Sequence, residues 1–137
     1  MATQLFKRCL VQGASRGIGL EYTRQLLAKP AVELVVATSR HPDLSRDLQQ
    51  LKHEHGDRLL CLPMDLAQPA SIAAAAADLE NQRGSIEPFH FLINCSGFLH
   101  SAQDKIMPER KLADVTYEML QRNFQVIRAM SGPVLRY

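Results

Sequence analysis

Residues 13–19, with the sequence G-A-S-R-G-I-G, have the residue types and the spacing of a phosphate-binding loop. Gly13 permits a tight turn, Gly17 lets a pyrophosphate approach the backbone, and Gly19 lets a following helix pack closely on a preceding strand. The segment follows an apolar run and opens a stretch with helical periodicity, which is the context that such a loop requires. The alternative interpretation is a glycine-rich connection that binds no ligand.

A second polar cluster, Thr38-Ser39-Arg40, lies about 20–25 residues beyond the glycine loop, where an NAD-binding protein places an Asp or Glu on the ribose 2′-OH. This sequence has no acidic residue there. Arg40 would bind a 2′-phosphate as a bidentate, charge-assisted pair, and Arg16 would add a second positive charge. The cluster therefore predicts NADP(H) in preference to NAD(H), with two solvated arginines as the alternative.

Two more polar clusters follow apolar runs directly. Asp65-Leu66 comes after the third run, and Asn94-Cys95-Ser96-Gly97 comes after the fourth. Taken singly, each could serve turn geometry alone, because Asp, Asn and Gly favour turns for reasons of backbone conformation. Together with the glycine loop they form an ordered series, one cluster after each apolar run.

The segments that must position these clusters alternate between strand and helix patterns. Strands are predicted at 5–11, 32–38, 58–64 and 89–93, and helices at 17–28, 44–55, 71–83 and 112–130, with a long loop at 98–110. Helices between strands give the crossovers that parallel strands need. The sequence thus predicts an α/β fold, the N-terminal portion of a Rossmann-type doubly wound parallel sheet, whose ligands bind beyond the strand carboxyl ends.

Length and composition limit the classes of protein to which this chain can belong. The 137 residues have room for one domain, and a formal net charge of +2 argues against nucleic acid as a partner. The apolar runs are too short to span a membrane, and no secretory signal is visible, so we expect a cytoplasmic protein. Cys9, Cys61 and Cys95 form no C-x-x-C pair, and we predict no metal site.

The ordered series resembles the short-chain dehydrogenase/reductase superfamily, which carries G-x-x-x-G-x-G after the first strand, Asp after the third and N-N-A-G or a variant after the fourth. The likeness covers about residues 4–126. More loosely, the glycine loop, the turn at 94–97 and the segments at 108–109 and 124–126 are similar to the C-factor-like or sniffer-like carbonyl reductases. The resemblance implies hydride transfer between NADP(H) and a small carbonyl or alcohol substrate.

The resemblance also implies roles for individual residues. The glycine loop would enclose the pyrophosphate and the adenosine ribose, Arg40 would bind the 2′-phosphate, and Asp65 would reach the adenine amino group. Leu66 would line the adenine pocket, and Asn94, Ser96 and Gly97 would border the path of the ribose and nicotinamide. The implied cofactor-binding residues are Gly13, Ser15, Arg16, Gly17, Ile18, Gly19, Arg40, Asp65, Leu66, Asn94, Ser96 and Gly97.

The catalytic residues of the family are not found at their expected spacing. These enzymes use a Tyr with a Lys four residues later, because a nearby cation lets tyrosine donate a proton near neutral pH. Here Tyr22 and Tyr117 have no Lys at that spacing, and Tyr137 is the last residue printed. Asn123 is not at the place of the family's helical Asn, and Gln12 replaces the Thr usual before the first glycine. We assign no catalytic residue.

Two hypotheses follow for residues 1–137, which we expect to form a single NAD(P)-binding Rossmann domain that is incomplete at its C-terminus. In the first, the chain is the nucleotide-binding part of an NADP(H)-dependent oxidoreductase. In the second, it is a catalytically silent nucleotide-binding fragment or isoform that forms a homo- or hetero-oligomer through an exposed sheet edge. A third hypothesis is that the chain is an incomplete product without a function, since native domains are only marginally stable.

Overall fold

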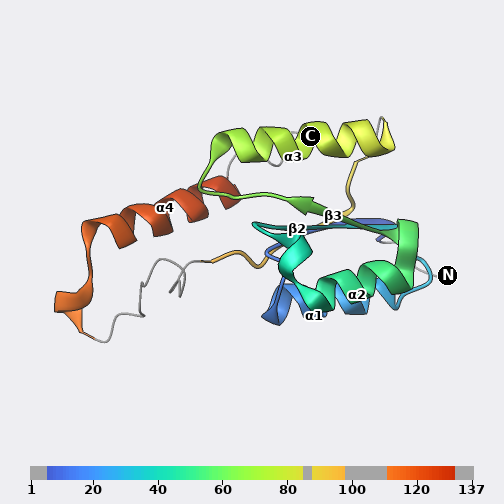
Figure 1. The fold of residues 1–137 in the computed structure, drawn as a ribbon, viewed down its shortest axis with the longest axis horizontal. Coiled ribbons are helices and arrows are strands. Elements are labelled where there is room, and N and C mark those ends of the chain that lie inside the picture. The colour runs from blue at the N-terminus through green and yellow to red at the C-terminus, as the bar shows by residue number, and fades with distance from the viewer. Residues whose placement is uncertain (1–5, 85–87, 98–110, 132–137) are drawn as a thin grey trace.

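A computed structural model describes residues 6–84, 88–97 and 111–131 of the chain. Strands and helices alternate along it (Figure 1). The strands are β1 (Arg8–Gln12), β2 (Leu34–Ser39), β3 (Leu59–Pro63) and β4 (Phe91–Asn94), and the helices are α1 (Gly17–Leu27), α2 (Arg46–His55), α3 (Pro69–Arg83) and α4 (Tyr117–Ser131). Short 3-10 turns at Pro42–Leu44, Gly56–Arg58 and Leu112–Asp114 precede α2, β3 and α4.

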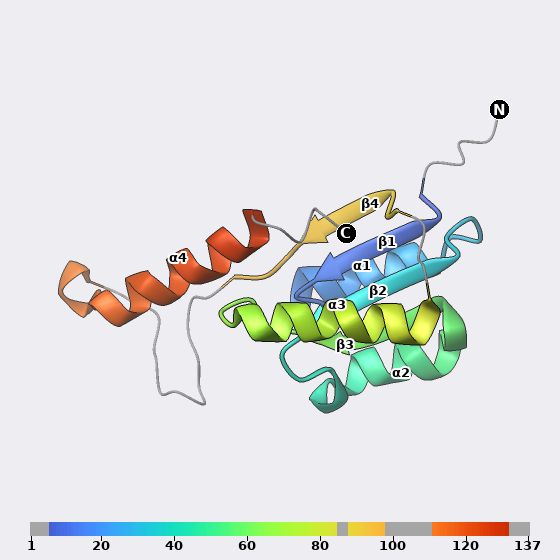
Figure 2. The same cartoon turned by 90° about the horizontal axis from the view of Figure 1, so that it is seen from above.

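The four strands form one parallel sheet in the order β3-β2-β1-β4. The chain moves outward from β1 to β2 and β3, and then returns to the other side of β1 for β4 (Figure 2). The direction of winding therefore reverses between β1 and β4, which is the point where open α/β sheets bind ligands. This arrangement confirms the predicted Rossmann-type sheet.

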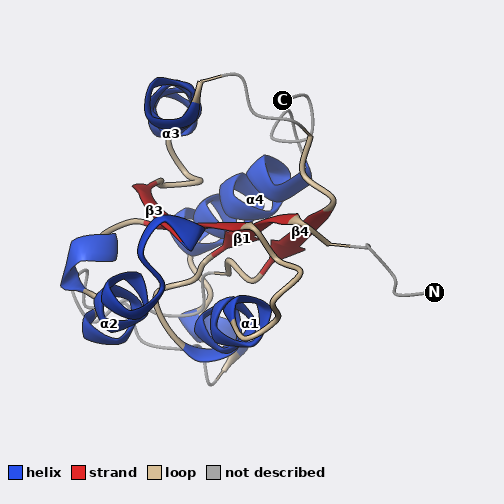
Figure 3. Cartoon of the chain, turned by 90° about the vertical axis from the view of Figure 1, so that its right-hand side faces the viewer, coloured by secondary structure: helices blue, strands red, loops and turns tan. Residues whose placement is uncertain are grey.

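Helices cover both faces of the sheet, with α1 and α2 on one face and α3 on the other (Figure 3). The larger core cluster joins alternate β1 and β2 residues, such as Val11 and Val35, to Leu26 of α1 and Leu48 of α2. A smaller cluster on the opposite face places Val36 and Leu62 near α3. All six residues of β2 are buried, as expected for a strand with helices on both sides.

The observed strands lie one to three residues later than the sequence predicts at their amino ends. The apolar patterns begin before the ladders do, because residues such as Val32 are buried by packing against α1 and α2 without pairing in the sheet. The shift places Gln12, Ser39 and Asn94 within strands. The last predicted helix divides into the 3-10 turn and α4, and the predicted loop at 98–110 lies outside the described residues.

In the described ranges, no helix is both long and apolar enough to cross a membrane. Those residues also contain no group of three or more His, Cys, Asp or Glu side chains with the geometry to hold a metal ion.

Candidate functional site

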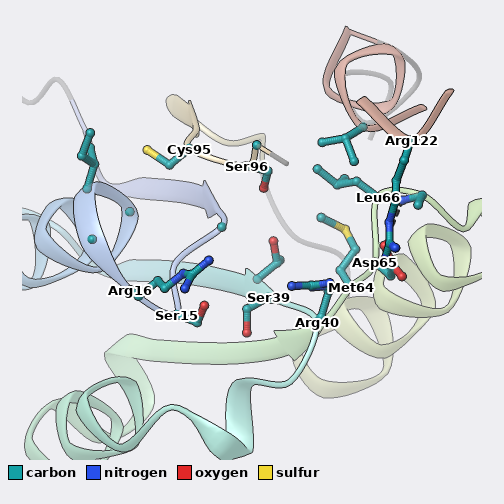
Figure 4. A pocket seen from close by; sticks show the side chains of 18 residues that line it. Ser15, Arg16, Ser39, Arg40, Met64, Asp65, Leu66, Cys95, Ser96 and Arg122 are labelled. Carbon is teal, nitrogen blue, oxygen red and sulfur yellow. Dashed lines mark hydrogen bonds between the residues drawn. The ribbon is translucent and has the colours of Figure 1, made fainter. Parts of the chain in front are cut away.

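A cleft of about 750 Å³ lies at the carboxyl ends of the strands, where the four polar clusters meet (Figure 4). It is bordered by the glycine loop, the ends of β2 and β3, the turn after β4, and one face of α4. Its lining residues are Gly13, Ser15, Arg16, Gly17, Ile18, Gly19, Thr38, Ser39, Arg40, Met64, Asp65, Leu66, Ala67, Cys95, Ser96, Gly97, Arg122 and Val126.

The glycine loop is fixed to its neighbours through its backbone. The N–H groups of Gly13 and Ala14 both donate to the carbonyl oxygen of Thr38, at 2.9 and 3.0 Å. Gly13 has a φ of +78°, and a Cβ there would lie 2.9 Å from backbone atoms of Cys95 and Ser96. A side chain at Gly19 would collide with the carbonyl oxygen of Gly13. Both glycines are therefore required by close backbone approach.

Gly17, the remaining glycine of the loop, lies at the cleft without a close contact to other backbone atoms. Gly17 has a φ of +58°, and a Cβ there would meet nothing within 4 Å. Its backbone borders open space at the first residue of α1, whose early N–H groups have no intrahelical partners. No acidic residue lies in this first turn. The positive end of the helix dipole thus borders the cleft and suits a phosphate group.

Helix α2 supports the glycine loop through Ser45. The Ser45 hydroxyl donates to the carbonyl oxygen of Ser15 at 2.7 Å and accepts from the N–H of Leu48 at 3.4 Å. One side chain therefore both caps α2 and holds the loop. Ser45 was not among the predicted site residues, although a Ser before an amphipathic helix is a recognisable capping signal.

Two arginines flank the loop side of the cleft. Arg16 precedes α1, Arg40 follows β2, and both line the cleft, as Figure 4 shows. Ser39, the last residue of β2, is 7% exposed, and its hydroxyl has no hydrogen-bond partner among the described residues. With Arg122, three arginines and one aspartate line the cleft in the described part of the chain, which makes it an electropositive site.

The end of β3 provides a carboxylate and an apolar wall. Asp65 Oδ1 accepts from the N–H of Ala67 at 3.0 Å, and its Oδ2 accepts from the side chain of Gln68 at 3.3 Å. The Asp65 N–H donates to the Ser71 hydroxyl at 2.9 Å, which ties the turn to the start of α3. Leu66 is buried.

The turn after β4 closes the cleft opposite Asp65. The Cys95 N–H donates to the carbonyl oxygen of Gln12 at 2.9 Å, which continues the ladder between β1 and β4. Cys95, Ser96 and Gly97 line the cleft, but Asn94 does not. It is the exposed last residue of β4 and is the one predicted site residue that the structure leaves outside the cleft.

Gln12, which stands where the family usually has Thr, is fully buried, and neither its amide nitrogen nor its amide oxygen has a partner among the described residues. An unpaired buried amide lowers stability.

The family's proton-donating Tyr and Lys are not among the described residues that line the cleft, and the other candidates considered from the sequence have structural surroundings. Burial raises the pKa of the Cys95 thiol, which keeps it protonated near neutral pH. Asn123 donates from Nδ2 to the carbonyl oxygen of Met119 at 2.9 Å within α4, which is a structural contact. Tyr22 is partly exposed on α1, Tyr117 is exposed at the start of α4, and neither lines the cleft.

Helix α4 contributes two residues that sequence reasoning missed. Arg122 and Val126 line the cleft four residues apart, on one face of the helix. Their spacing in the sequence indicates a shared face but does not say what that face meets. Met64 and Ala67 were missed as well, whereas Thr38, Ser39 and Cys95 belonged to the predicted clusters without being assigned roles.

The family model and the curated relatives that match this sequence indicate the same family. The sequence matches the model of the family described as short chain dehydrogenase over residues 7–137. Short-chain dehydrogenase anuI of Penicillium roqueforti is 28% identical over 127 residues, which cover 93% of this chain and 49% of that protein. The chain spans about half or less of the length of the curated relatives it matches.

Solved structures agree with this result. An NADPH-bound carbonyl reductase from chicken fatty liver is 32% identical, with a TM-score of 0.72, over 88% of this chain and 42% of that one. A carbonyl reductase from Pseudomonas aeruginosa PAO1 in complex with NADP is 26% identical, with a TM-score of 0.66, over 91% of this chain and 55% of that one. The narrower C-factor-like or sniffer-like subgroup stays a prediction. Because the family match extends over nearly the whole sequence, the chain belongs to the short chain dehydrogenase family.

Proposed function

We propose that the chain binds NADP(H) in the cleft and is the nucleotide-binding part of an oxidoreductase that acts on small carbonyl or alcohol substrates. The observation that carries the proposal is the meeting of the glycine loop, the N-terminus of α1 and two arginines in one cleft at the switch point of the sheet. Two similar solved structures are carbonyl reductases with NADPH or NADP bound, which supports the choice of cofactor.

The cleft residues fit the parts of this nucleotide. The open backbone at Gly17 and the N–H groups of α1 would hold the pyrophosphate, and Arg16 and Arg40 would hold the 2′-phosphate. Asp65 would accept a hydrogen bond from the adenine amino group beside Leu66. Ser96 and Gly97 would border the nicotinamide end. The bound cofactor would supply the hydride, and these residues would bind and orient it.

A reduction also needs a proton donor, and no tyrosine or lysine is among the described residues that line the cleft. We therefore propose that residues 1–137 act as one nucleotide-binding domain and that other residues supply the acid. The three cysteines, all free, suit a reducing compartment, and we propose a cytoplasmic location.

The experiment that tests this proposal is calorimetric titration of the chain with NADPH and, separately, NADH, with circular dichroism to establish folding. We expect NADPH to bind with higher affinity than NADH, and no reduction of aldehydes or ketones by the chain alone. A folded chain that binds neither nucleotide would contradict the proposed site. Turnover of a carbonyl panel by the chain alone would show that the acid lies within it.

A second candidate function is that of a catalytically silent nucleotide-binding chain that associates through the edge of its sheet. Strand β4 has a neighbour on one side only in the described sheet, and Phe91 on it is 36% exposed. Further along the chain, Tyr117, Leu120 and Phe124 on α4 are exposed apolar residues. Such surfaces favour association. Light scattering over a range of concentrations, alone and with a full-length homologue, tests it; a monomer that binds no homologue would contradict it.

A further inference from the structure

Helix α4 forms one wall of the cleft at the end of β3. Val126 packs against the cluster formed by Met64, Leu66 and Ala75, and this contact fixes the position of the helix relative to the strand end. Arg122 lies one helical turn earlier on the same face and lines the cleft. The packing of Val126 therefore determines where the Arg122 side chain can reach.

Arg122 extends from α4 toward the turn after β3, to which Asp65 and Leu66 belong (Figure 4). The Asp65 carboxylate is oriented by Ala67 and Gln68 of its own turn. This side of the cleft therefore offers a carboxylate that other contacts hold in place, next to the apolar side chain of Leu66, which is 7% exposed.

The positions of the three cleft arginines separate their roles. Figure 4 shows Arg16 at the glycine loop and Arg40 between it and Asp65, next to Met64, whereas Arg122 comes from α4 on the side of Asp65. The first two are placed to bind phosphate groups. A planar guanidinium group on the same side of the cleft as the apolar Leu66 and a hydrogen-bond acceptor has the chemistry to bind a flat aromatic ring that carries an amino group.

We infer that Arg122 stacks on the adenine ring while Asp65 accepts from the adenine amino group, an inference that rests on the proposed function. Arg122 is then a determinant of affinity for the adenine ring, separate from the arginines that would bind the 2′-phosphate.

The test compares the full chain with Arg122→Met, which removes the charge and the plane, and Arg122→Lys, which keeps the charge. Arg128→Met is the matched control, because Arg128 is exposed on the same helix and does not line the cleft. Each protein is titrated with NADPH, 2′,5′-ADP, 5′-AMP and reduced nicotinamide mononucleotide. Thermal unfolding of each variant shows whether it folds as the wild type does.

Arg122→Met is expected to weaken binding of the three adenine-containing ligands by a similar factor of about 3 to 30, the range of a desolvating cation–π contact. Binding of the mononucleotide should not change, and Arg128→Met should match the wild type. Arg122→Lys should fold normally and remain weakened for 5′-AMP, because lysine lacks the planar group.

Other outcomes overturn the inference in distinguishable ways. A loss confined to 2′,5′-ADP and NADPH, with full rescue by Arg122→Lys, would make Arg122 a phosphate contact. An equal loss for all four ligands, with a lower unfolding temperature, would make it a purely structural residue. If the wild type binds NADPH and Arg122→Met binds it equally well, only this inference fails. If the wild type binds none of the ligands, the proposed function fails with it.

Discussion

Two glycines in this chain both have a positive φ but lie in different places, which allows strain to be separated from binding. Gly17 has a φ of +58° and borders the cleft, whereas Gly84 has a φ of +68° and ends α3 outside the cleft. A Cβ at either position would meet no atom within 4 Å. Gly17→Ala and Gly84→Ala therefore each place a side chain at a positive φ, which strains the backbone, and neither creates a collision within the protein.

The expected magnitudes follow from these facts. Placing alanine at a positive φ costs of order 1–3 kcal/mol, so both variants should lose about that much of their free energy of unfolding. In Gly17→Ala the new methyl group also occupies the space where a pyrophosphate would approach the helix N-terminus. Loss of one charge-assisted hydrogen bond, about 1.5–3 kcal/mol, would weaken NADPH binding roughly ten- to hundredfold.

The chain has no Trp, so urea unfolding is followed by circular dichroism and not by tryptophan fluorescence. NADPH affinity is measured by calorimetry. Gly84→Ala is expected to bind NADPH as the wild type does despite its lower stability. The reasoning is refuted if Gly17→Ala keeps wild-type affinity. It is refuted equally if Gly84→Ala loses as much affinity, because binding would then follow global stability and not the cleft.

Arg40→Asp should weaken NADPH binding and shift the preference toward NADH, because it removes a phosphate partner and adds a ribose acceptor; titration with both nucleotides measures the ratio, with the exposed Arg46→Asp as the control for charge. Ser45→Ala should lose about 1–2 kcal/mol of stability in urea unfolding and also weaken NADPH binding, because one hydroxyl caps α2 and holds the Ser15 carbonyl oxygen at 2.7 Å. Burial raises the pKa of the Cys9 thiol from 9.0 to about 11, so the free energy of unfolding should fall as pH rises from 9 to 11, and Cys9→Ala should reduce that slope in unfolding curves measured across this range.

These three predictions fail on separate results. An unchanged ratio of NADPH to NADH affinity in Arg40→Asp, or an equal shift in Arg46→Asp, would remove the phosphate role of Arg40. A Ser45→Ala variant that is less stable but binds normally would limit Ser45 to capping. The sign for Cys9 follows from its higher pKa in the folded state, which holds the proton longer than the unfolded chain does; a stability that rises above pH 9 would contradict it.

The local features of the site could be predicted from the sequence, because each depends on neighbours along the chain. The glycine loop lies between a buried strand and a helix, and Arg40 follows the next strand, so the period of the apolar residues was enough to place them at one edge of a parallel sheet. The same reasoning placed Asp65 and Ser96 there. Strand ends were less accurate, since apolar residues such as Val32 are buried without joining the ladder.

Tertiary structure decided which side chains the cleft includes. Asn94 belongs to the same cluster as Ser96 and Gly97, yet as the exposed last residue of β4 it lies outside the cleft. Arg122 enters the cleft because Val126 packs on Met64 and Leu66, a contact between segments more than 50 residues apart. Spacing along one helix shows which residues share a face, but what that face meets depends on how distant elements pack. The sequence by itself determined the glycine loop and its charge, because both depend on neighbours along the chain, and packing between distant segments determined the wall that faces the loop.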